Sequence, residues 1–525
     1  MDRFELLYRG SLKSCNYRCS YCPFSKHRIS EKELLKDREQ WVHFVQTTEQ
    51  YAAAHRIRTL MVAPYGEALI HPWYWEGLGR LSTVAELEAV GAQTNLSFPF
   101  QESMELFQKA GGNCDKLYLW ATFHPEMVSV RSFAAMCRQL LQEGIHLCAG
   151  AVGVPQNIEV LQKLRDSLPE ELYLWINSMD GLGRAYTKQE TEAFLKIDPY
   201  FFTELSTIPA DFTQCRGRLF VEADKGVRLC NISRCTGMGQ EEFWNIQQQM
   251  TSSETPADLP LLSCGRKHCS CYLAYGGRKN FMNDILFGPY PIFRIPRRAR
   301  AVFLDIDGTL LPKRSSGQER VDSWIRAGLE GLCRDKIPLF FATSLPYQEV
   351  RKRCREVWHL FSGGIFAAGA HMVVWDIQRG SEEKWEDVLE LKEACLSVLK
   401  EIEKNIRCRL LSYRTEGKLY KITMLRPDSM QWKEEEREAT AKTLQRAGIC
   451  KVRVFTEDNC LQIVSNRATK AEGVRRICRR LHISPEETAA AGDSAEDVEM
   501  LKISGQQSIA FEVNNTQIAC SIRKN

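Results

Sequence analysis

The first 200 residues alternate short β-rich runs with amphipathic helical stretches, and this alternation restricts the fold more than any other feature of the 525-residue chain. The longest helical pattern covers residues 31–54. Strands that alternate with helices pair in parallel through right-handed crossovers. We therefore expect an α/β barrel or partial barrel, with its chemistry at the carboxyl ends of the strands. The predicted strands are residues 4–10, 58–63, about 88–95, 116–122, 145–153 and 172–177.

Three cysteines, Cys15, Cys19 and Cys22, lie in the loop that directly follows the first predicted strand. Their spacing allows one short loop to bind a single iron–sulfur cube. A [4Fe–4S] cluster normally takes four cysteines, so three leave one iron open for another ligand. A zinc site is the alternative. It needs a fourth Cys or His nearby, and His27 is available.

This cysteine spacing, with Tyr21 before the last cysteine, resembles the motif of the radical S-adenosylmethionine (radical SAM) superfamily. The resemblance implies a partial (β/α)6 radical SAM barrel over residues 1–200, whose cofactors are a [4Fe–4S] cluster and SAM. It also implies that the open iron chelates the methionine part of SAM, with Tyr21 among the cofactor-binding residues. Reductive cleavage would then give a 5′-deoxyadenosyl radical, with flavodoxin or ferredoxin as an electron donor.

A second motif follows the second predicted strand, where Gly66 and Glu67 lie in the segment APYGEAL. It is similar to the GGEP segment of the same superfamily, which implies that Gly66 and Glu67 bind the SAM amino group. Tyr65 and Ala68 replace the first glycine and the proline of that segment. Three further polar residues lie at or just past strand ends and are candidates for the barrel mouth: Asn95, His124 and Asn177.

Six more cysteines lie between residues 201 and 275. They resemble the auxiliary-cluster extensions of radical SAM enzymes, which implies one auxiliary Fe–S cluster as a further cofactor; structural zinc remains the alternative. Residues 222–230 predict a hairpin that leads to Cys230, and residues 276–298 predict a linker. The candidate ligands are Cys215, Cys230, Cys235, Cys264, Cys269 and Cys271.

Composition indicates where the protein is expected to reside and which classes of partner it is not expected to bind. The chain has 20 cysteines but no apolar signal segment at its start, so we expect reduced thiols and a cytoplasmic location. A net charge of +4 does not indicate a nucleic-acid partner, and no apolar run of about 18 residues predicts a membrane span.

The segment AVFLDIDGTLLP (301–312) predicts a buried strand that ends in Asp305 and Asp307. Two carboxylates at the tip of a parallel strand suit phosphoryl transfer, in which one attacks phosphorus and the other acts as acid and base. The segment closely resembles the first motif of the haloacid dehalogenase (HAD) superfamily. The later motifs occur in order and contribute Thr343, Lys470, Asp493 and Asp497.

The resemblance assigns roles to these residues. Asp305 is the expected nucleophile and Asp307 the acid and base, Thr343 binds the phosphoryl group, and Lys470 offsets its charge. Mg²⁺ would be held by Asp305, the Asp307 carbonyl and Asp493, with Asp497 in support. Thr343 is followed by Ser-Leu-Pro, where many relatives have Gly-Arg, so the usual arginine is missing.

Residues 299–525 are thus expected to form a HAD Rossmann-like domain with an inserted α/β cap over about 365–462, similar to caps of sugar-phosphate phosphatases. Arg414 and Lys421 are candidate substrate contacts in the cap. The leading interpretation is a bifunctional enzyme acting on a small, phosphorylated or unphosphorylated molecule. The alternatives are a peptide-modifying radical SAM maturase with a passenger HAD domain, and a non-enzymatic zinc or iron–sulfur scaffold.

Overall fold

The computed structural model describes residues 4–22, 27–55, 57–205, 208–209, 218–223, 226–228, 268–269, 281–287, 291–295, 299–312, 320–376, 381–427, 430–457 and 459–509. The chain divides into two compact units, Met1–Arg297 and Arg298–Asn525. Among the described helices, none combines the length and the apolar character that a membrane crossing requires.

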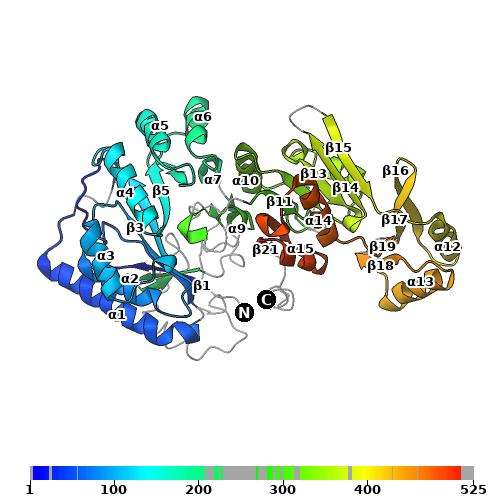
Figure 1. Ribbon diagram of the computed structural model, residues 1–525, viewed down its shortest axis with the longest axis horizontal. Coiled ribbons are helices and arrows are strands. Elements are labelled where there is room, and N and C mark those ends of the chain that lie inside the picture. The colour runs from blue at the N-terminus through cyan, green and yellow to red at the C-terminus, as the bar shows by residue number, and fades with distance from the viewer. Residues whose placement is uncertain are drawn as a thin grey trace. The chain divides into compact units, whose positions relative to one another are not determined.

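Unit 1 contains an eight-stranded sheet in the order β6-β5-β4-β3-β2-β1-β8-β9. Figure 1 labels β1, β3 and β5 of this sheet. Strands β1 to β6 all pair in parallel with their sequence neighbours. The predicted parallel α/β organisation is therefore confirmed. The strands are β1 (Phe4–Arg9), β2 (Ile57–Val62), β3 (Ala89–Thr94), β4 (Leu117–Phe123), β5 (His146–Val152), β6 (Leu174–Asn177), β8 (Arg218–Glu222) and β9 (Gly226–Arg228).

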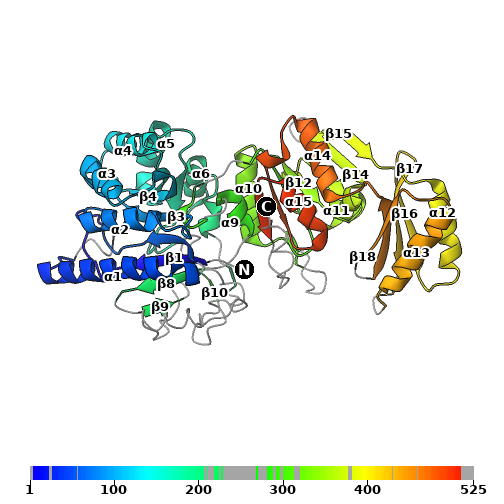
Figure 2. The ribbon, with the colours of Figure 1, turned by 60° about the horizontal axis from the view of Figure 1, so that its bottom comes forward.

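A helix follows each of the first six strands, and these helices pack along the sheet (Figures 1 and 2). Local sequence fixes where several of them begin. Ser129 caps α4 by accepting a hydrogen bond from the Ser132 amide, and Thr187 and Glu190 form a capping box at α6. The helices are α1 (Glu31–His55), α2 (Pro72–Ser82), α3 (Phe100–Lys109), α4 (Val130–Gln142), α5 (Ile158–Ser167), α6 (Lys188–Ile197), α7 (Phe202–Leu205) and α9 (Phe281–Phe287).

A hairpin is present near the predicted residues 222–230, but it begins earlier: β8 and β9 pair antiparallel, and β8 also pairs in parallel with β1. The cysteines expected beyond it cannot be placed. Cys215, Cys230, Cys235, Cys264 and Cys271 lie outside the described residues. Only the backbone of Cys269 is described, in β10 (His268–Cys269), which pairs with β7 (Ile208–Pro209).

Unit 2 contains a seven-stranded sheet in the order β15-β14-β13-β12-β11-β20-β21. The pairs β21-β20, β20-β11, β11-β12 and β12-β13 are parallel. Phe303 and Phe340 stack on one face of this sheet, in a core shared with α14 and α15, while Phe341 stacks on Phe361 on the other. The elements are β11 (Ala301–Leu304), α10 (Ser323–Arg334), β12 (Leu339–Ala342), α11 (Tyr347–Arg353), β13 (Gly363–Phe366), β14 (His371–Asp376), β15 (Ser381–Val388), α14 (Lys470–Leu481), β20 (Thr488–Gly492), α15 (Val498–Ile503) and β21 (Gln506–Ile509).

A separate four-stranded sheet in the order β16-β17-β19-β18 lies between β15 and α14 in the sequence, together with two helices. This insert starts later than the sequence indicated. Strand β14 pairs antiparallel with β13, and β15 pairs antiparallel with β14, so both strands extend the seven-stranded sheet and belong to the core and not to the predicted cap. The insert contains α12 (Glu393–Glu403), β16 (Arg409–Thr415), β17 (Lys418–Leu425), α13 (Glu434–Arg446), β18 (Val452–Glu457) and β19 (Cys460–Ser465).

Candidate functional sites

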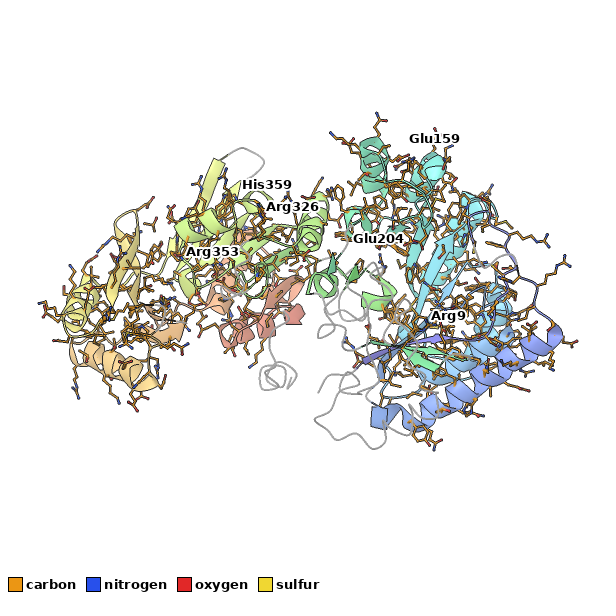
Figure 3. All side chains as sticks on the ribbon, turned by 180° about the vertical axis from the view of Figure 1, so that it is seen from behind. Arg9, Glu159, Glu204, Arg326, Arg353 and His359 are labelled. Atoms are coloured by element: carbon orange, nitrogen blue, oxygen red, sulfur yellow. The ribbon has the colours of Figure 1, made fainter. Side chains whose placement is uncertain are left out.

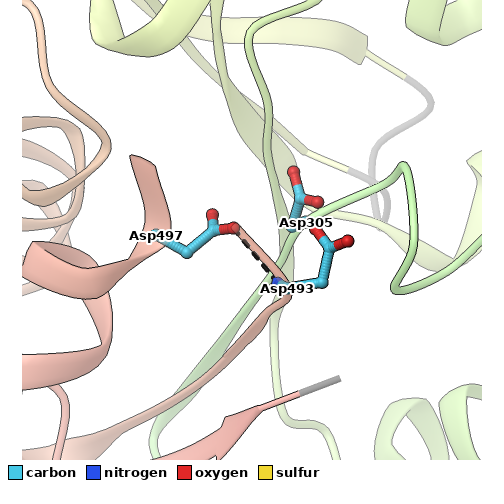
Figure 4. A group of neighbouring side chains, drawn as sticks. All are labelled: Asp305, Asp493 and Asp497. Atoms are coloured by element: carbon cyan, nitrogen blue, oxygen red, sulfur yellow. Dashed lines mark hydrogen bonds between the residues drawn. The ribbon is translucent and has the colours of Figure 1, made fainter. Parts of the chain in front are cut away.

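Three carboxylates meet at the carboxyl ends of two neighbouring parallel strands in unit 2. Asp305 follows β11, Asp493 follows β20, and Asp497 lies in the short turn Ala495–Asp497 that precedes α15. Their ligand oxygens all lie within 4.8 Å of one another, and all three side chains are buried (Figure 4). The sequence predicted these three residues as one site, and the strand order brings them together.

Lys470 is the first residue of α14, which begins there because Thr469 caps the helix by accepting from the Glu472 amide. Its Nζ lies 2.7 Å from Oδ1 of Asp305 and 2.6 Å from Oδ1 of Asp497. Burial raises the pKa of Asp305, and the Lys470 ammonium opposes that rise. Burial alone would lower the pKa of Lys470, but the two carboxylates raise it above its usual value.

Asp497 holds the shape of the loop after β20. Its Oδ2 accepts hydrogen bonds from the Asp493 amide at 3.2 Å and from the Ser494 amide and hydroxyl at 2.9 and 2.7 Å. A Cβ atom at Gly492 would lie 2.4 Å from the Asp497 side chain, so only glycine allows this approach. Asp497 therefore fixes the backbone on which the Asp493 carboxylate is carried.

Asp307 is not gathered with these carboxylates. It forms a bidentate ion pair with Arg353, at 2.7 and 3.0 Å. Thr343 lies at the end of β12 and is buried, and its Oγ1 accepts a hydrogen bond from the Leu345 amide at 3.1 Å. Sequence reasoning missed Arg353. The missing arginine after Thr343 was a signal to search for a replacement nearby.

The two cap candidates behave differently. Lys421, on β17, is buried and donates to the Ser344 carbonyl at 2.5 Å, next to Thr343. Arg414 is exposed and pairs with Glu393 of α12, inside the insert, so it is not brought to the carboxylate site. Arg453 of β18 was not predicted, yet it pairs with Glu496 in the loop that carries Asp493, at 2.7 Å.

In unit 1, the cysteine loop faces a cavity of about 670 Å³ at the carboxyl ends of β1 to β6. The structure thus brings together residues that the sequence placed at or after the ends of five different strands. Trp120, Trp175 and Arg9 also line the cavity, and sequence reasoning missed them because they lie inside the strands. The predicted residues in its wall are Cys15, Cys19, Tyr21, Cys22, Gly66, Glu67, Asn95, His124 and Asn177.

Cys19 is buried, and Cys15 and Cys22 are half-buried. Burial raises the pKa of Cys15, and it raises the pKa of Cys19 to about 11. The Asn95 side chain donates to the Cys15 sulfur at 3.7 Å. Among the described residues, these cysteines and the exposed His27 do not form a group of ligand atoms within 4.8 Å of one another.

Gly66 and Glu67 fasten the cysteine loop to the sheet. A Cβ atom at Gly66 would lie 1.6 Å from the Ser14 carbonyl oxygen, so a side chain there would collide with the loop backbone. The Glu67 amide donates to the same carbonyl at 3.1 Å. The buried Glu67 carboxylate accepts from the Leu69 amide, the Thr94 hydroxyl and the Asn95 amide, and burial raises its pKa to about 7.

Tyr21 and His124 form a pair in the cavity wall, in which the tyrosine hydroxyl lies 2.9 Å from Nδ1 of the histidine. Burial lowers the pKa of His124 to about 4, so the imidazole is neutral near pH 7. Asn177 contributes a buried amide oxygen, Oδ1, that has no hydrogen-bond partner among the described residues. The wall therefore offers uncharged polar groups beside the cysteines.

Comparison with known proteins identifies a family for part of unit 2. Residues 409–515 match the family model for haloacid dehalogenase-like hydrolases. Unit 2 therefore contains a HAD-superfamily hydrolase domain, with a HAD-like Rossmann fold. The match includes Lys470, Asp493 and Asp497, whereas Asp305 and Thr343 precede it. No curated protein matches the chain.

Solved structures similar to the chain include a haloacid dehalogenase-like hydrolase from Bacteroides thetaiotaomicron, which is 18% identical in sequence. The alignment covers 43% of this chain and 92% of the hydrolase, and its TM-score is 0.34. A second is a HAD subclass IIB sugar phosphatase, which is 18% identical in sequence; the alignment covers 42% of this chain and 90% of that chain, with a TM-score of 0.33. A third is a haloacid dehalogenase-like hydrolase from B. subtilis, with 17% identity, coverage of 40% and 88%, and a TM-score of 0.31.

Proposed function

We propose that unit 2 is a Mg²⁺-dependent hydrolase of small phosphomonoesters, with Asp305 as nucleophile. The observation that carries this proposal is the charge of the buried site. Asp305, Asp493 and Asp497 are at most 5% exposed as residues, and their ligand oxygens lie within 4.8 Å of one another. Buried charge needs compensation, and a hard dication with oxygen ligands supplies it.

Each residue of the site then has its own role in the proposed reaction. Asp305 attacks phosphorus while the bond to the leaving oxygen breaks, and Asp307 gives that oxygen a proton. Asp307 next takes a proton from water, which hydrolyses the aspartyl-phosphate. Lys470 offsets the charge on the phosphoryl group, and the Thr343 hydroxyl orients it. Mg²⁺, held by Asp305, Asp493 and the Asp307 carbonyl, would supply further charge neutralisation.

Phosphate release by the full-length protein tests this proposal. With p-nitrophenyl phosphate and Mg²⁺, we expect Asp305→Asn to lower kcat by at least about a thousandfold, as loss of a nucleophile does. Unchanged turnover would remove Asp305 from its role.

Metal binding is tested separately by melting temperature. Mg²⁺ should raise the Tm of the wild-type protein, and Asp493→Asn should reduce that rise. Glu499→Gln removes an exposed carboxylate from α15 and is the matched control. Equal Mg²⁺-dependent shifts in all three proteins would contradict the metal site.

We propose that unit 1 is a radical SAM enzyme. The supporting observation is the convergence of three cysteines, Glu67 and His124 on one cavity at the carboxyl ends of parallel strands. The donor set fits an iron–sulfur cluster: burial keeps the Cys15 and Cys19 thiols protonated unless a cationic centre binds them. A single tetrahedral zinc ion would require the sulfurs to lie about 4 Å apart, and the three do not form such a group.

When bound, a [4Fe–4S] cluster and SAM supply reductive cleavage of a carbon–sulfur bond. Cys15, Cys19 and Cys22 would hold the cluster, while the neutral Tyr21–His124 pair and Asn177 would orient SAM or the substrate by hydrogen bonds. Unit 1 would need an electron donor such as flavodoxin or ferredoxin.

Anaerobic reconstitution of the full-length protein tests the second proposal. We expect about four irons and four sulfides per cluster, and formation of 5′-deoxyadenosine from SAM. Cys19→Ala should lose iron and cleavage. Cys114→Ala, a half-buried cysteine outside the cavity, should retain both. Zinc without iron at the cysteine loop would contradict the proposal.

A further inference from the structure

Ser344 follows Thr343, the residue expected to bind the phosphoryl group, at the position where many HAD relatives carry glycine. It is only 7% exposed and lies in the turn between β12 and α11. The Leu345 amide closes this turn by donating to Oγ1 of Thr343 at 3.1 Å. Ser344 is therefore the middle residue of the turn that directs the Thr343 hydroxyl. The turn leads into α11, whose last residue, Arg353, is labelled in Figure 3.

The insert binds Ser344 from two sides. The Ser344 carbonyl accepts a hydrogen bond from Nζ of Lys421 on β17 at 2.5 Å, and the Ser344 hydroxyl donates to the carboxylate of Glu457 on β18 at 2.5 Å. Both bonds include a charged group, and such hydrogen bonds are shorter and stronger than neutral ones. Because one bond holds the backbone and the other holds the side chain, a rotation of the turn would break at least one of them.

The register of the insert directs two cations toward the core. Lys421 pairs with Val464 of β19, and Val464 pairs with Arg453 of β18, so the three side chains form one row across the sheet. Val464 packs in an apolar cluster that includes Ala367 of the core. One end of the row, Lys421, binds the turn after β12, and the other end, Arg453, binds Glu496 in the loop after β20 at 2.7 Å. The insert therefore contacts both of these loops at once.

Glu457 is held in place by its own neighbours. Its second carboxylate oxygen accepts from Nε2 of Gln462 at 3.4 Å, and Oε1 of Gln462 accepts from the Thr423 hydroxyl at 2.6 Å. Gln462 and Thr423 are both buried. A connected polar network of this kind holds its members in one geometry. The carboxylate that binds the Ser344 hydroxyl is thus oriented from within the insert.

We propose that Lys421 and Glu457 are positioning residues for phosphoryl transfer, which act through Ser344 on the Thr343 hydroxyl. While both contacts are made, the turn is fixed and the hydroxyl is directed at the transferring phosphoryl group. When either contact is lost, the turn rotates more freely and the hydroxyl loses its orientation. This inference rests on the hydrolase function proposed for unit 2, and it gives the insert a part in the reaction step itself.

Phosphate release by the full-length protein from p-nitrophenyl phosphate, with Mg²⁺, tests the inference. We expect Ser344→Ala and Glu457→Ala each to lower kcat by about tenfold, because a hydrogen bond to a charged group is lost. KM should change by less than about threefold, since a contact that orients the reacting group acts mainly on kcat. Glu457→Gln keeps an acceptor oxygen for the Ser344 hydroxyl and should retain kcat within about threefold of the wild-type value. A wild-type kcat in Ser344→Ala would overturn the inference.

A Thr343→Ala background separates positioning from a general effect on the fold. If Ser344 acts through the Thr343 hydroxyl, Ser344→Ala should lower kcat by less than about twofold once that hydroxyl is absent. A tenfold loss that persists in this background would contradict the inference. A retained Mg²⁺-dependent rise in Tm shows that each variant is folded. Lys421→Met, which removes the other contact, carries the same test if Ser344→Ala does not fold.

Glu393→Gln is the matched control within the insert. It removes an exposed carboxylate of α12 whose partner, Arg414, also belongs to the insert. The kcat of this variant should stay within about twofold of the wild-type value. A tenfold loss in Glu393→Gln would show that any change in the insert lowers kcat, and would count against a specific role for Ser344.

The two proposals fail in different ways. If Asp305→Asn still hydrolyses p-nitrophenyl phosphate, the hydrolase proposal fails, and the inference about the insert fails with it. If Asp305→Asn is inactive but Ser344→Ala keeps the wild-type kcat, only the inference about the insert fails.

Discussion

Charged side chains are buried in both units, and their partners decide what each can do. In unit 2, Lys470 joins the carboxylates of Asp305 and Asp497, which with Asp493 form a buried group of oxygen ligands. A hard dication prefers such ligands. In unit 1, Arg294 and Glu204 form an ion pair in which both side chains are fully buried, and Arg294 also stacks over Trp175. That pair is fully enclosed and supports the wall of the cavity, so we assign it to structure.

Asp198 is a buried carboxylate whose effect on stability can be measured. It accepts hydrogen bonds from the Tyr173 hydroxyl and from the Ile176 and Tyr200 amides, and burial raises its pKa to about 7. Because the unfolded carboxyl ionises near pH 4, the folded state binds the extra proton between about pH 4 and 7. Stability from this group is present below pH 4 and is lost as the pH rises through 7.

We therefore expect Asp198→Asn to weaken the pH dependence of unfolding. The free energy of unfolding of the variant, relative to that of the wild type, should rise by about 2–4 kcal/mol from pH 4.5 to pH 7.5. Denaturant unfolding of the full-length protein at several pH values measures it. A difference that does not change with pH would contradict a raised pKa.

At the scale of elements, both sites form where loops follow parallel strands. In unit 1, the loop after β1 is held by the turn after β2 and by the end of β3, through Gly66, Glu67 and Asn95. In unit 2, the loop after β11 faces the loop after β20. The four-stranded sheet of the insert contacts the seven-stranded core through Lys421 and Arg453, which bind the loops after β12 and β20.

Gly66→Ala tests the packing of the cysteine loop. The added methyl would meet the Ser14 carbonyl at 1.6 Å, so the backbone must shift, and we expect a loss of about 1–3 kcal/mol together with reduced iron incorporation. Gly144→Ala is the control: Gly144 has a positive φ of 77° but no atom within 4 Å. The Gly144→Ala variant should lose about 1 kcal/mol of unfolding free energy and incorporate as much iron as the wild type. Full iron incorporation in Gly66→Ala would show that the loop tolerates the shift.

At the scale of the molecule, two compact units each carry a candidate site built from their own residues. A shared metabolite is the simplest reason to join the radical SAM enzyme that we propose for unit 1 to the phosphatase that we propose for unit 2. A peptide-modifying maturase and a metal-binding scaffold remain the alternatives for unit 1.

The units should be chemically separable within the full-length chain. We expect Cys19→Ala to abolish SAM cleavage while kcat for p-nitrophenyl phosphate stays within about twofold, since the cysteine and the carboxylates lie in different units. Asp305→Asn should abolish hydrolysis of p-nitrophenyl phosphate and retain SAM cleavage. Both activities are measured on the same anaerobic preparation, and loss of both in either variant would show that the units depend on each other.

The sequence alone predicted the parallel α/β organisation of unit 1, a hairpin near residues 222–230 and the carboxylates of unit 2, because strand periodicity and short motifs are local signals. The extent of the cap was misjudged. Strands β14 and β15 have the same local pattern as cap strands, and only their hydrogen bonds to β13 place them in the core.

Tertiary structure alone decided which side chains meet. Arg353 and Asp307 are 46 positions apart, and Glu67 and Asn95 are 28 positions apart, yet each pair is in contact. No local pattern encodes such contacts, because they depend on which strands become neighbours and on where each loop turns. Sequence thus supplied the reacting groups, and folding decided that Asp307 is bound to a guanidinium while Asp305 is bound to an ammonium.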